Sequence, residues 1–155
     1  GIRVPDHGAL NPWKIITLKG KARKKFSEQV VLPSFLEKNP DATKDDVELE
    51  KNRFNRASIV ICVLSCPVMH DKIPEWEMHL SSSLVCYNML LASQSLGFAA
   101  QWVTGWCAYD EKILEALGGN ITKDKIVGFI YIGGKETEPK ERIRPNFNKI
   151  VSKWK

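Results

Sequence analysis

The segment that follows Pro74 places the strongest constraint on how this chain of 155 residues can fold. Apolar and small side chains fill positions 78–95, and no Asp, Glu, Lys or Arg interrupts them. Pro74 is suited to the start of a helix, and Glu75 and Glu77 favour the positive end of a helix dipole. We therefore predict one long helix, from Pro74 to about Ser95, that is buried on most sides.

Four segments have the composition of β-strands, and they are separated by helical patterns. The predicted strands are Lys14–Leu18, Ser58–Ser65, Phe98–Thr104 and Lys125–Gly133. The second and fourth are apolar and rich in β-branched residues, which is typical of central strands buried on both faces. These elements predict a mixed α and β fold with a small sheet.

Three further helices complete the predicted order. The helix Lys21–Lys38 must kink or end at Pro33, because proline lacks the N–H that a helix interior requires. Thr43 is a suitable N-cap for a helix over Lys44–Arg56, and a short helix covers Asp110–Leu117. Residues 1–155 show no internal repeat and predict a single domain, with a basic C-terminal tail over 135–155.

Composition and charge exclude several classes of protein. Apolar residues make up 43% and charged residues 26%, as in ordinary globular domains, and no apolar run reaches the roughly 20 residues that span a bilayer. The net charge is +5, but the basic residues of 19–25 and of the tail belong to no recognition motif. We expect solvated surfaces there, which makes nucleic acid an improbable partner.

The four cysteines and three histidines have no metal-ligand spacing, so the sequence predicts no metal site. The cysteines have apolar or small neighbours, which is typical of buried thiols. Four such cysteines without a secretory signal predict a reducing compartment, the cytoplasm.

Two short segments have polar residues that a buried core does not require. In the first, residues 3–13, Pro5 and Pro12 stiffen a loop that presents Arg3 and His7 ahead of a strand. A guanidinium there is suited to phosphate or to a ring with several carbonyl groups. A plain surface turn with solvated side chains is the alternative interpretation.

The second segment, residues 97–106, lies at the end of a predicted strand. Gly105 lets the backbone approach a ligand closely, and Thr104 offers a hydroxyl and an N–H to a planar polar ring or a phosphate. Trp102 on its own is as well explained by core packing. The two segments together are the stronger indication of a binding site.

Four motifs in the same order resemble the nitroreductase family, and in particular its small single-domain branch. They are Arg3–Trp13, Ile73–Glu77, Gly97–Gly105 and Asp124–Gly133. The resemblance implies an α+β, nitroreductase-like fold with a small, mainly antiparallel sheet flanked by helices. It also implies a homodimer with the long helix at its interface.

The resemblance further implies two FMN sites at that interface, each built from both chains. By position, Arg3 and His7 match flavin contacts of the first motif, and Trp102, Val103 and Thr104 match those of the second. The expected activity is an FMN-dependent oxidoreductase that passes electrons from NAD(P)H to nitroaromatic or quinone-like acceptors by a ping-pong scheme. Because the flavin performs that chemistry, no catalytic acid or base is predicted.

The chain departs from the family at one point. The Arg-Arg-Ser-type segment that grips the FMN phosphate in the family is absent, so either the N-terminal part of the family domain lies upstream of Gly1, which we expect, or this chain binds flavin poorly. Arg142 and Arg144 are weaker candidates for that phosphate. Two alternatives stay open: a flavin-binding member with other or no reductase chemistry, and a basic nucleic-acid-binding module that uses residues 19–25.

Overall fold

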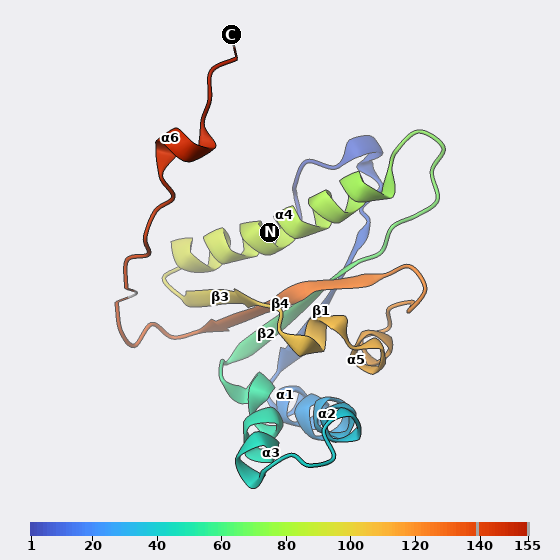
Figure 1. The fold of residues 1–155 in the computed structure, drawn as a ribbon, viewed down its shortest axis with the longest axis vertical. Coiled ribbons are helices and arrows are strands. Elements are labelled where there is room, and N and C mark those ends of the chain that lie inside the picture. The colour runs from blue at the N-terminus through green and yellow to red at the C-terminus, as the bar shows by residue number, and fades with distance from the viewer. Residues whose placement is uncertain (139, 155) are drawn as a thin grey trace.

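The computed structural model describes residues 1–138 and 140–154. The chain folds into three layers, with one sheet as the middle layer. The sheet contains β1 (Trp13–Lys19), β2 (Ile59–Ser65), β3 (Ala99–Val103) and β4 (Lys125–Gly133). The strands pair antiparallel in the order β1-β2-β4-β3. Figure 1 shows the long helix α4 (Glu75–Ser95) on one face and the shorter helices on the other. The predicted α+β class and its antiparallel sheet are confirmed.

Alternation along β2 explains why this strand is central. Val60, Cys62 and Leu64 point toward the shorter helices, whereas Val63 joins Val85 of α4 in a second apolar cluster. All of these side chains are fully buried. Because burying each one contributes about 1.5–3 kcal/mol, β2 and its partner β4 bind the two outer layers to the sheet.

The predicted helix Lys21–Lys38 continues through Pro33, so of the two predicted outcomes, a kink or an end, the end does not occur. It consists of α1 (Lys21–Phe26), a π-helical segment over Ser27–Val31, and α2 (Leu32–Lys38). The Leu32 N–H donates to the Ser27 carbonyl, five residues back. This wider turn lies directly before Pro33, which occupies the first turn of α2, where an N–H is not needed.

The helix α3 (Lys44–Lys51) begins as predicted and ends earlier than predicted. Thr43 and Asp46 form a reciprocal capping box at its start. At its end the Asn52 amide donates to the Glu48 carbonyl, and a 3₁₀ turn over Arg53–Asn55 replaces the last predicted turn. Asparagine side chains compete with the backbone for helix carbonyls, which accounts for the early end.

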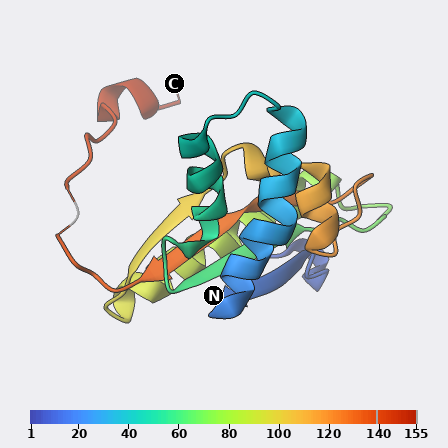
Figure 2. The same ribbon diagram turned by 90° about the horizontal axis from the view of Figure 1, so that it is seen from below.

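The connection from α4 to β3 and on to β4 agrees with the prediction except for one added turn. Gly97 has φ 84° and donates to the Gln94 carbonyl, so it ends α4 as expected. A 3₁₀ turn over Trp106–Tyr109, which was not predicted, leads into α5 (Glu111–Ala116). The last short helix, α6 (Phe147–Ile150), lies on an arm that extends away from the three layers (Figures 1 and 2).

The prediction that α4 is buried on most sides is wrong for the single chain. One face packs on the sheet, but the opposite face leaves five large apolar side chains exposed by 39–67%. They recur at helical spacing and form one stripe: Trp76, Leu80, Leu84, Tyr87 and Leu91. Small side chains such as Ser81 and Ser82 instead lie on the buried face against the sheet. In the described part of the chain, no helix is both long and apolar enough to cross a membrane.

Candidate functional site

The N-terminal motif forms a tight, internally bonded turn before β1. The Asp6 carboxylate accepts the Asn11 N–H at 2.7 Å, and the Asn11 amide donates to the Ala9 carbonyl at 2.9 Å. Gly8, Ala9 and Asn11 all have positive φ, between 50° and 72°. Two non-glycine residues in this region mark a turn that its surroundings hold in place, which is common at functional sites.

This turn presents Arg3 and His7 along the outer side of α4. The Asn88 side chain of α4 donates to the Arg3 carbonyl at 3.0 Å, and the Arg3 side chain is exposed. The Nδ1 atom of His7 lies 2.7 Å from the Glu77 carboxylate, near the beginning of α4. The segment therefore runs antiparallel to α4, with the His7 ring oriented by a carboxylate.

The second motif lies on β3, which is an edge strand and so leaves part of its backbone unpaired. The Trp102 indole donates to the Val127 carbonyl at 3.1 Å and lies against Gly128, where any Cβ would come within 2.0 Å of Nε1. Val103 pairs with Phe129, and Thr104 follows half-buried just past the strand. The indole N–H of Trp102 is thus already bonded within the fold. Thr104, in contrast, lies beyond the last pair of residues that joins β3 to β4.

The two predicted groups share a layer without touching each other. Val4 of the first motif and Trp102 of the second pack on the same apolar cluster between α4 and the sheet. In the parts of the chain that are described, no hydrogen bond or ion pair joins Arg3 or His7 to residues 102–104. One chain alone therefore places the two motifs on a common apolar cluster and does not close them into one pocket.

A hollow of about 380 Å³ lies beside the β3 edge and has basic side chains at its rim. Arg56 and Arg142 line it together with Gln101 and Tyr131. Arg142, which begins the C-terminal arm, therefore lies near the predicted ring-binding strand. Arg144 instead pairs with Glu141 on the exposed surface of that arm.

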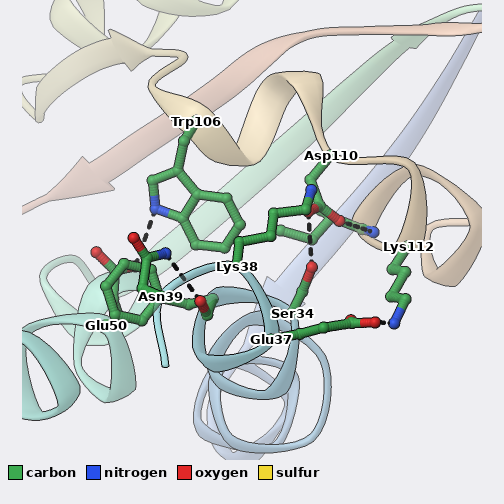
Figure 3. Close-up of polar contacts among 10 residues, drawn as sticks. Ser34, Glu37, Lys38, Asn39, Glu50, Trp106, Asp110 and Lys112 are labelled. Carbon is green, nitrogen blue, oxygen red and sulfur yellow. Dashed lines mark hydrogen bonds and ion pairs between the residues drawn. The ribbon is translucent and has the colours of Figure 1, made fainter. Parts of the chain in front are cut away.

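Residues that sequence reasoning missed hold the segment after Thr104 against the helical layer. Asp110 is 2% exposed; its carboxylate accepts from Ser34, Lys38 and the Ile113 N–H (Figure 3). Burial raises the pKa of Asp110, but the hydrogen bonds from those three donors outweigh it and leave the pKa below its ordinary value. The acid therefore stays ionised while it caps α5.

A second buried carboxylate fixes Trp106 at the start of the 3₁₀ turn. Glu50 accepts from the Trp106 indole N–H at 3.2 Å (Figure 3). It also accepts from two nitrogens of Arg53. The hydrogen bond to Glu50 raises the pKa of Arg53 further above its usual range. Neither Glu50 nor Arg53 belongs to a sequence motif. Only their three-residue spacing in a predicted helix could have suggested that they form an ion pair.

A serine, a histidine and a glutamate also line up beneath the start of α4. Ser65 Oγ lies 2.8 Å from His79 Nδ1, and His79 Nε2 lies 3.0 Å from Glu75. Ser65 is only 1% exposed, and Ser82 donates to its oxygen as well. A nucleophile must reach its substrate, so this array connects β2 to α4 and is not a catalytic triad.

The remaining candidate groups are structural in the described residues. Cys62, Cys86 and Cys107 are buried free thiols as predicted, whereas Cys66 is half-exposed. No group of three His, Cys, Asp or Glu side chains is placed to hold a metal ion in residues 1–138 and 140–154. In the basic segment 19–25, the Arg23 guanidinium donates to the Asn55 and Ala57 carbonyls. This side chain therefore joins α1 to the loop before β2.

Comparison with known proteins agrees with this architecture. The sequence profile of the nitroreductase family matches residues 1–134. YdjA of Escherichia coli K12, named as an NAD(P)H nitroreductase, is 33% identical over 137 residues, which is 86% of this chain and 70% of YdjA. A Haemophilus influenzae protein of the same designation is 29% identical and covers 90% of this chain and 75% of its own length.

Solved structures show the same fold at lower sequence identity. A nitroreductase-like family protein from Bacillus cereus has a TM-score of 0.82 and 23% identity, and the match covers 97% of this chain and 77% of that one. A Bacteroides fragilis nitroreductase with bound FMN has a TM-score of 0.65 and 16% identity, covering 98% and 82% of the two chains. With the profile match over most of its length, this chain belongs to the nitroreductase family.

Proposed function

We propose that this protein is an FMN-dependent oxidoreductase that takes electrons from NAD(P)H and passes them to an electron-poor acceptor such as a nitroaromatic or a quinone. The single observation that supports this most is the family match over residues 1–134, which includes both polar motifs. The proposal extends to this chain the NAD(P)H of the relatives' names and the FMN of the structural neighbour.

The residues present fit a flavin in their chemistry. The pyrimidine side of the isoalloxazine ring has carbonyl and ring-nitrogen acceptors, and the candidate positions supply donors: the Arg3 guanidinium, the Thr104 hydroxyl and N–H, and free backbone of the β3 edge. Val103 contributes backbone groups only. When bound, FMN would supply two-electron chemistry, which no side chain here can perform.

The function of the protein itself is then to hold, orient and shield that ring. Arg3 and His7 offer positive charge or N–H donors that stabilise negative charge on the reduced ring. Glu77 keeps the His7 imidazole in one orientation through its Nδ1 atom. Arg142 and Arg56, beside the β3 edge, are the candidates for the phosphate.

We also propose that the site is completed by a second copy of this chain. The stripe on α4, Trp76 to Leu91, is a row of exposed apolar side chains of the kind that marks a contact surface between proteins. Stacking two such helices would place the first motif of one chain beside the second motif of its partner. The exposed apolar residues of the C-terminal arm add to the surface available for contact: Ile143, Phe147, Ile150, Val151 and Trp154.

The test is an absorption spectrum of the purified protein after incubation with FMN and removal of the excess. Bound flavin that bleaches anaerobically with NADH or NADPH and recovers with a quinone supports the proposal. Flavin that binds and never bleaches favours a family member with different chemistry. Protein that takes up no FMN refutes both readings.

The Arg3 assignment is tested with a matched pair of variants. Arg3→Ala should weaken FMN retention, whereas Lys25→Ala, which removes an exposed cation from α1, should leave it unchanged. Equal flavin occupancy in the two variants contradicts the role of Arg3.

We also propose that the protein is located in the cytoplasm, a prediction that its four free thiols support.

A further inference from the structure

The buried ion pair at the end of α3 contacts the 3₁₀ turn that follows the proposed flavin-binding strand β3. Glu50 is 3% exposed, and both of its carboxylate oxygens are used. Arg53 Nε donates to one oxygen at 2.5 Å, and the Trp106 indole N–H shares that oxygen. The pair therefore joins α3 to a tryptophan only two residues beyond Thr104.

Trp106 is held from three directions. Its indole N–H is bonded to Glu50, the Arg53 guanidinium carbon lies 5.8 Å from its ring centroid, and the Phe35 ring lies 5.7 Å away on a tilt. Gly105, between Trp106 and Thr104, has φ 62°, and a Cβ there would lie 3.8 Å from Arg53 Nη1. The backbone from Thr104 to Trp106 is thus seated against the guanidinium.

Packing α3 against the 3₁₀ turn at Trp106 does not require a buried ion pair. Apolar side chains of similar volume usually join layers as well as a buried ion pair does, because removing charges from water is costly. What an apolar group cannot do is accept the Trp106 N–H and so set one orientation of the loop. The buried charges therefore have a directional role at this position.

We propose that Glu50 and Arg53 are positioning residues for flavin binding, which they perform through Trp106 by fixing the Thr104–Gly105 backbone. This inference rests on the proposed function, because it assigns to the pair the alignment of the Thr104 donors with the flavin ring. Neither residue is placed in contact with the flavin. The pair acts as the support that a binding group needs to hold one geometry.

The first test uses Trp106→Phe, which keeps an aromatic ring between Phe35 and Arg53 and removes the N–H together with the smaller ring of the indole. We expect the dissociation constant for FMN to rise about tenfold, as when a supporting contact behind a ligand is lost, with a changed visible circular dichroism of the bound flavin. Lys112→Ala is the control, since it removes an exposed ion pair between Glu37 of α2 and Lys112 of α5 on the same face of the sheet. It should leave both measurements unchanged.

The second test separates positioning from stability. The triple variant Glu50→Leu/Arg53→Met/Trp106→Phe leaves none of the three polar groups unpaired, so its Tm should equal or exceed that of the parent. Its FMN affinity should nevertheless stay about tenfold weaker, and amide hydrogen exchange at residues 104–106 should be faster without flavin. Parent-like affinity and flavin circular dichroism in this variant would overturn the inference.

The failure of the proposed function is distinguishable from the failure of this inference. If the parent protein takes up no FMN, the proposed function is refuted, and hydrogen exchange at 104–106 still reports on the pair. Unchanged exchange in Trp106→Phe then shows that the pair does not order the loop, and the inference falls independently.

Discussion

Replacing Asp110 with alanine should destabilise the protein by an amount that the contacts of this carboxylate define. The change removes the N-cap of α5, which accepts the Ile113 N–H at 2.9 Å, and this loss costs about 1 kcal/mol. It also leaves the buried Ser34 hydroxyl without its acceptor at 2.6 Å, for about 1–2 kcal/mol more. Lys38 is largely exposed, so solvent replaces its lost partner.

The free energy of unfolding should therefore fall by about 2–3 kcal/mol in Asp110→Ala. Asp110→Asn is the matched variant, because its amide oxygen still caps α5 while the negative charge is gone; we expect a loss of about 1 kcal/mol. Urea unfolding at one fixed protein concentration measures both, provided that the slope against urea stays constant. A loss below about 0.5 kcal/mol in Asp110→Ala would refute this reasoning, because that is the size of an ordinary surface substitution.

The same carboxylate gives a pH dependence of known sign. The pKa of Asp110 is lower in the folded protein than in the unfolded chain, so the unfolded chain binds the proton first. The stability that this group adds is complete above the unfolded pKa, about 4, and is lost as the pH falls through the lower folded value. The difference between the parent and Asp110→Asn should therefore shrink in acid, and a difference that grows in acid would contradict the assignment.

Three further outcomes are expected. Gly128→Ala should displace the Trp102 indole and lower Tm, since the new Cβ would lie 2.0 Å from Nε1; a fluorescence emission like that of the parent would speak against this. Leu84→Asp on the α4 stripe should shift sedimentation toward the monomer, whereas Leu49→Asp, at an exposed position on α3, should not. Burial, with a smaller effect of a nearby carboxylate, raises the pKa of Cys66 to about 11; its alkylation in the native protein should be slow at pH 8 and speed up about tenfold per pH unit.

The sequence was informative where side-chain pattern and local turn chemistry decide the structure. The apolar run of β2, the low charge of α4 and the glycine after it predicted elements that the structure confirms almost to the residue. The N-cap at Thr43 is predictable for the same reason, because its partner Asp46 lies three residues away. These features depend on neighbours in the chain, which a single sequence displays.

Features that depend on distant neighbours were not predictable in this way. Pro33 signals the end of a helix, but a π-helical segment directly before it lets the helix continue to Lys38. The side-chain partners of Asp110 lie more than 70 residues away, and Trp106 meets Glu50 across 56 positions. The apolar stripe of α4 was read as buried because composition does not reveal whether a neighbouring surface comes from the same chain.

The π-helical segment has a consequence for how this layer tolerates changes in length. A π-turn holds one residue more than an α-turn, and each residue in an α-helix advances the helix by about 100°. Deleting one residue from a regular α-helix would rotate everything downstream by about that angle, whereas deleting a single residue between Ser27 and Val31 would restore ordinary winding and leave the downstream residues facing as they do now. Ser34 and Lys38 would then still face Asp110, so we expect this stretch to tolerate the loss of one residue better than the regular helix on either side of it.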